Sequence, residues 1–133
     1  MRLLFFSACL LSPIAIAATD EARYASFLRA LRAAGIQVQT LGPVDQPFFS
    51  AKGKVINLSG EHVQVFEYPS ATEAEAEAAL VSPNGRTVGA AKPHWLGPPH
   101  FFKRGKIIAL YLGDGAKTLK ALEAQLGPQF AGD

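Results

Sequence analysis

The segment KIIALYL, Lys106–Leu112, carries apolar side chains on both faces of an extended chain, because successive residues of a strand point to opposite sides. This pattern is typical of a strand inside a sheet that is covered on each side. Ile107, Ala109 and Tyr111 share one of these faces. The sequence therefore requires a cover for that face, either from the first helix or from a second copy of the protein in a homodimer.

Three further strands are predicted upstream. Phe48–Leu58 and Glu61–Tyr68 are rich in aromatic and β-branched residues and meet at Ser59-Gly60, which predicts a hairpin. Ile36–Leu41 alternates apolar and polar residues through Thr40, as a strand with one buried face does, and the loop Gly42–Pro47 is expected to end it.

Two segments next to these strands have patterns that predict helices. Asp20–Ala34 is amphipathic, with Thr19 or Asp20 as its N-cap and Gly35 as its left-handed stop. Ser70 and Glu73 form a capping-box pattern before an alanine- and glutamate-rich run, which favours a second helix over a strand.

The last part of the chain predicts two strands and a third helix. Pro93–Leu96 is expected to be a short strand, and His100–Phe102 leads into the turn before Lys106–Leu112. Asp114 is the expected cap of a helix that ends at Gly127. The order αβββαββα predicts an α+β fold: a mainly antiparallel sheet of four or five strands with helices packed on one face.

The first residues have the layout of a secretory signal peptide. A basic Arg2 precedes an apolar run, and small residues stand at Ala15 and Ala17, so cleavage is expected after Ala17. Residues 1–17 are then the signal peptide and residues 18–133 a single α+β domain that is periplasmic or extracellular. The alternative is a lipid anchor through Cys9, although the apolar run continues past that residue.

Composition excludes several classes of protein. The 133 residues carry a formal net charge of +2 and one cysteine, Cys9. A nearly neutral chain has no long-range field to gather nucleic acid, and none is expected as a partner. Cleavage after Ala17 would leave a cysteine-free mature chain with no transmembrane span, which excludes disulfides and thiol catalysis.

Parts of the last two thirds of the chain resemble a known family. The relevant stretches are VQVFEYPSATEAEAEAALVSPNG (Val63–Gly85), HWLGPPHFFKRGKIIALYLGDG (His94–Gly115) and LEAQLGPQF (Leu122–Phe130), of which the run from Trp95 to Tyr111 is the most specific. They are similar to a family of small exported or lipid-anchored bacterial proteins, most of them without an assigned activity. The resemblance implies an envelope location and a compact domain, and it implies no reaction.

Aromatic and proline residues cluster after Ala91. Rigid prolines beside amphipathic rings suit stacking on a planar ligand, a sugar or a partner protein. The alternative is that these rings close the core. The residues predicted to bind a ligand or partner are Trp95, Pro99, His100, Phe102 and Tyr111.

No motif predicts a catalytic centre, a cofactor or a metal site. His62, His94 and His100 lack metal-ligand spacing and would need the fold to bring them together. The segment Leu112–Thr118 departs from a phosphate loop, because Ala116 and Tyr111 stand where that motif has glycines.

The sequence thus predicts an exported, non-enzymatic protein that binds a partner or small ligand through its aromatic and proline surface. One alternative is a small periplasmic enzyme or metal protein that uses His94 and His100 with a carboxylate such as Asp114. The other is a structural envelope protein without a site.

Overall fold

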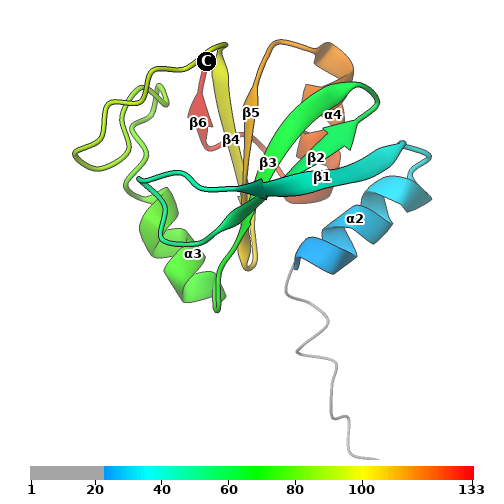
Figure 1. Ribbon diagram of the computed structural model, residues 1–133, viewed down its shortest axis with the longest axis horizontal. Coiled ribbons are helices and arrows are strands. Elements are labelled where there is room, and N and C mark those ends of the chain that lie inside the picture. Colours follow the sequence, from blue (N-terminus) through cyan, green and yellow to red (C-terminus); the bar gives the residue numbers. More distant parts are fainter. Residues whose placement is uncertain (1–22) are drawn as a thin grey trace, which may run out of the picture.

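The computed structural model describes residues 23–133, which form an α+β fold with three helices and one sheet of six strands (Figure 1). The helices are α2 (Tyr24–Ala33), α3 (Ala71–Ala78) and α4 (Ala116–Leu126), and the strands are β1 (Val38–Val44), β2 (Gly53–Leu58), β3 (Glu61–Glu67), β4 (Pro99–Arg104), β5 (Ile107–Leu112) and β6 (Ala131–Gly132).

The sheet is antiparallel throughout, with the strand order β1-β2-β3-β5-β4-β6. The predicted element order αβββαββα is confirmed in outline: Pro99–Arg104 takes the place of the short strand expected at Pro93–Leu96, and the chain adds β6 at its end. The sheet has six strands rather than four or five because Ala131 and Gly132 pair with β4 at Phe101 and His100. A strand of two residues is too short to produce a sequence pattern.

The predicted turns and caps are largely confirmed. Ser59 and Gly60 have φ angles of 50° and 98°, as a tight hairpin turn with matching twist requires. Gly35 ends α2 with a φ of 82°, and the Ser70 hydroxyl accepts the Glu73 amide at 3.1 Å at the start of α3. The predicted cap residues Thr19 and Asp20, like the predicted signal peptide, lie outside the described residues.

Three strand boundaries differ from the prediction. β1 continues to Val44 because a bulge between Thr40 and Gly42 lets the chain stay paired with β2 beyond the expected loop. β2 begins only at Gly53. Pro93–Leu96 is not a strand; the strand starts at Pro99, and the first residue of a strand is a position where a missing amide donor costs little.

Helices cover both faces of the sheet, which corrects the expectation of helices on one face. Ile107, Ala109 and Tyr111 pack with α2 and α4, while Ile108 and Leu110 belong to the core under α3. Figure 1 shows α3 on the opposite side of the sheet from α2 and α4. The cover required for Ile107, Ala109 and Tyr111 therefore comes from within the chain.

The face under α3 is covered incompletely. A helix of this length spans about 12 Å, and α3 packs over the end of the face that holds Phe66 and Ile108. The other end, around Val55 and Gln64, lies beyond the helix and beside the 79–98 segment. No helix in residues 23–133 has the length and apolarity to cross a bilayer.

Candidate functional site

The five residues predicted to bind a ligand do not form one exposed surface. His100, Phe102 and Tyr111 have exposed fractions of 6%, 1% and 1%, and Pro99 is also buried. Phe102 and Tyr111 pack under α2 and α4, whereas Trp95 packs on the opposite side of the sheet. The physical reason is the alternation of β4 and β5, which sends neighbouring rings into two separate cores.

Tyr111 has a structural role. Its hydroxyl accepts the Gly115 amide at 2.9 Å, next to the first turn of α4. Asp114 is exposed and does not cap the helix, contrary to the prediction, since the N-cap position belongs to Gly115. The loop that superficially resembles a phosphate-binding turn is thus folded around the tyrosine hydroxyl.

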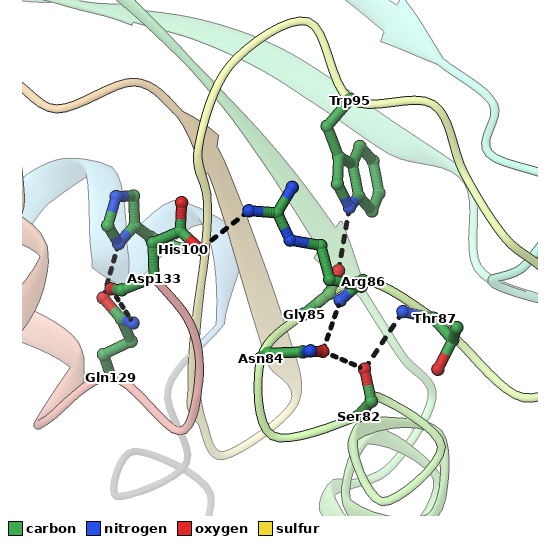
Figure 2. Close-up of polar contacts among 9 residues, drawn as sticks. All are labelled: Ser82, Asn84, Gly85, Arg86, Thr87, Trp95, His100, Gln129 and Asp133. Atoms are coloured by element: carbon green, nitrogen blue, oxygen red, sulfur yellow. Dashed lines mark hydrogen bonds and ion pairs between the residues drawn. The ribbon is translucent and has the colours of Figure 1, made fainter.

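The histidines are not gathered into a metal site. His62 and His94 are exposed, while His100 is buried with Nδ1 2.7 Å from Gln129 Oε1 (Figure 2). Among residues 23–133 no cluster of three or more potential ligands is present.

Trp95 lines a hollow of about 440 Å³ on the partly covered face of the sheet. Phe48 packs edge-to-face against the indole with ring centroids 5.5 Å apart. The wall continues through Pro93, His94 and Leu96, which belong to the 79–98 segment. Of the predicted aromatic residues, Trp95 is the one that borders this hollow.

A second hollow of about 410 Å³ adjoins the first, because both are lined by Gln64, Leu96 and Leu112. Its floor includes Val55, which pairs with Gln64 across β2 and β3. We call the two hollows together the sheet groove. Leu96 stands between them with an exposed fraction of 94%.

Polar as well as apolar side chains line the sheet groove. Gln46 Nε2 donates to Gln64 Oε1 at 2.9 Å, so two amides lie side by side in the middle of the groove. Lys92 and His94 line the Trp95 end, and Glu61 and His62 line the other end. Within residues 23–133 neither Lys92 nor Glu61 takes part in a salt bridge.

Hydrogen bonds hold Trp95 in place (Figure 2). Its Nε1 donates to the Gly85 carbonyl at 2.8 Å. The turn that contains Gly85 is held by Asn84 Oδ1, which accepts from Ser82 Oγ at 2.9 Å and from the Arg86 amide at 3.0 Å. Arg86 also reaches the C-terminal Asp133 at 3.2 Å.

Glu73 and Glu77 on α3 do not line the sheet groove. Glu77 accepts both the amide and the hydroxyl of Ser50, which fastens α3 to the loop before β2. Burial, and secondarily the Glu77 carboxylate, raise the pKa of the Tyr68 phenol well above its ordinary value. The contact of Glu77 with Ser50 stabilises the fold on the α3 side.

Sequence reasoning missed Gln46, Gln64 and Leu96 as groove residues. Gln64 lies in a strand whose alternation marks it as facing away from Val63 and Val65, and that signal was present in the sequence. Leu96 lies between Trp95 and Gly97 in a segment without periodicity, so no pattern indicated its exposure.

Comparisons of the chain with protein-family models, with curated proteins and with solved structures find no match.

Proposed function

We propose that this protein is an exported, non-enzymatic binding protein whose sheet groove takes up a small ligand or a short segment of a partner. The observation that carries the proposal is Leu96, 94% exposed between two adjoining hollows. An aliphatic side chain in that position loses its contact with water when a ligand fills the groove, and this burial favours binding.

The lining of the sheet groove supports binding. Ligand pockets are mostly apolar, with a small number of polar groups that fix the orientation of the ligand. Trp95, Phe48 and Leu112 supply apolar surface here, and the paired amides of Gln46 and Gln64 supply uncharged polar groups. Each hollow has a volume within the usual range for such sites.

Trp95 provides the first test, because it is the single tryptophan of the chain. Anilinonaphthalene sulfonate, an apolar fluorescent dye with an anionic group, is expected to bind the groove and quench Trp95 by energy transfer. Leu96→Asp should abolish the quenching. Leu80→Asp is the matched control, since Leu80 is 50% exposed and lies outside the groove lining. Equal quenching in both variants and the wild type would contradict the proposal.

The proposed export rests on the first residues and on the resemblance described above. Intact-mass measurement of the protein expressed in a bacterial host with its full leader is expected to show the loss of residues 1–17. A mass increased by a lipid on Cys9 would favour anchoring. A full-length mass would contradict cleavage.

A further inference from the structure

The charges of the sheet groove differ in sign at its two ends. Lys92 lines only the hollow beside Trp95, and Glu61 lines only the other hollow, with Gln64, Leu96 and Leu112 between them. Both charged residues are exposed, and neither is in a salt bridge within the described part of the chain. The groove therefore complements a dipolar ligand with an anionic group at one end and a cationic group at the other.

The middle of the groove complements groups that both donate and accept hydrogen bonds. The bond from Gln46 Nε2 to Gln64 Oε1 uses one donor of the first amide and one lone pair of the second. Each side-chain amide has two N–H donors and an oxygen with two lone pairs, so both retain capacity for a ligand. A peptide bond offers the matching donor and acceptor.

The apolar surface narrows the choice of ligand. An acyl chain would cover Val55 and Leu112 but would leave the remaining donors and acceptors of the two amides without partners after desolvation. A neutral saccharide would pair with the amides but would carry no charges complementary to Lys92 and Glu61. A peptide with apolar side chains can cover the aliphatic residues, bond the two amides through its backbone and place a charged terminus at each end of the groove.

We infer that the sheet groove binds a short peptide with free termini and apolar side chains, its carboxylate toward Lys92 and its ammonium group toward Glu61. This inference rests on the proposed function of the groove. The Gln46 and Gln64 amides then bond the peptide backbone, and Leu96 packs against a peptide side chain.

Trileucine is the probe, and isothermal titration calorimetry at low ionic strength is the measurement. Unmodified trileucine is expected to bind, and either an N-acetyl group or a C-terminal amide should weaken binding by about two- to fivefold, the range for partly exposed ion pairs. In Lys92→Gln, amidation of the trileucine C-terminus should not weaken binding further. In Glu61→Gln the N-acetyl group should cost nothing further, because a double-mutant cycle isolates each pair.

Lys120→Gln is the matched control, since Lys120 is exposed on α4 and does not line the groove. It should retain the full response to both modifications. If the modifications cost nothing in the wild type, or if their effects do not depend on Lys92 and Glu61, the inferred orientation is overturned. If the dye quenches Trp95 but trileucine does not bind, the peptide inference fails while the proposed function stands; if neither binds, both fail.

Discussion

The indole Nε1 of Trp95 donates a 2.8 Å hydrogen bond to the carbonyl of Gly85, ten residues earlier in the chain. This bond fixes one wall of the sheet groove to a turn that touches the C-terminal strand, because the Gly132 amide donates to the Pro83 carbonyl at 3.0 Å. The geometry of the groove therefore depends on the last residues of the chain.

Gly85→Ala should loosen Trp95. Gly85 has a φ of 70°, and a Cβ there would lie 3.0 Å from the Gly132 backbone and 3.2 Å from the Phe101 ring. We expect a loss of about 1–2 kcal/mol from the left-handed conformation and about 1 kcal/mol more from crowding, together with a change in the Trp95 emission. Urea unfolding followed by circular dichroism measures the loss in the free energy of unfolding.

The control for that variant is Gly89→Ala, with a φ of 58° and nothing within 4 Å of the added Cβ. It should show the conformational cost alone and leave the Trp95 emission unchanged. An equal effect of both substitutions would contradict a role for close packing at Gly85.

Gly132→Ala should detach β6. An added Cβ would overlap the Pro99 carbonyl oxygen, so the strand must move away from β4. Hydrogen exchange is the measurement: the Asp133 amide, which donates to the Pro99 carbonyl at 3.0 Å, should lose its protection. Gly127→Ala, whose Cβ would have nothing within 4 Å, should keep that protection.

Tyr111→Phe should destabilise the start of α4. The variant leaves the Gly115 amide without its acceptor at 2.9 Å, and an unsatisfied, partly buried donor costs about 1–3 kcal/mol. Gly115→Ala is expected to be destabilising as well, since its Cβ would lie 2.7 Å from the Tyr111 hydroxyl. The two losses should be less than additive, because removal of the hydroxyl makes room for the methyl group. Strict additivity in urea unfolding would disprove this coupling.

Tyr68→Phe should change the response of stability to alkaline pH. Burial raises the pKa of the Tyr68 phenol, so the folded protein keeps a proton that the unfolded chain releases above its ordinary value of 10.0. The unfolded state then binds fewer protons, and the free energy of unfolding falls as the pH rises above about 10. In the variant the free energy of unfolding should fall less steeply above this pH, by up to about 1.4 kcal/mol per pH unit.

Near neutral pH the same substitution should be neutral or stabilising by about 1 kcal/mol. The Tyr68 hydroxyl is buried and has no hydrogen-bond partner within residues 23–133, so its removal breaks no bond. Urea unfolding at neutral and alkaline pH tests both statements, and an unchanged alkaline slope would contradict the assignment to Tyr68.

Local patterns predicted the features of this fold that depend on a few neighbouring residues. The Ser59-Gly60 turn, the Ser70 cap and the Gly35 stop each follow from backbone conformations available to those residue types. The bulge in β1 and the pairing of Ala131 with Phe101 depend on partners far along the chain. No local pattern contains that information.

The candidate site was predicted in part. Trp95 borders the sheet groove as an aromatic residue available to a ligand, whereas Phe102 and Tyr111 belong to the core. Composition could not assign each ring to a face or to the surface, because that depends on which element covers each side of the sheet. Phe101 and Phe102 are neighbours in β4 and therefore lie on opposite sides of the sheet, and each side is covered.

From the sequence alone come the order of helices and strands, the hairpin between β2 and β3, and a strand at Ile107–Leu112 that is buried on both faces. These follow from side-chain periodicity and turn chemistry, which are local. Tertiary structure decided that helices cover both faces, that α3 leaves one end of its face open, and that Leu96 stands exposed over that end. Those outcomes depend on strand order and on the path of a loop rich in proline and glycine. Contacts between residues far apart in the sequence determine both.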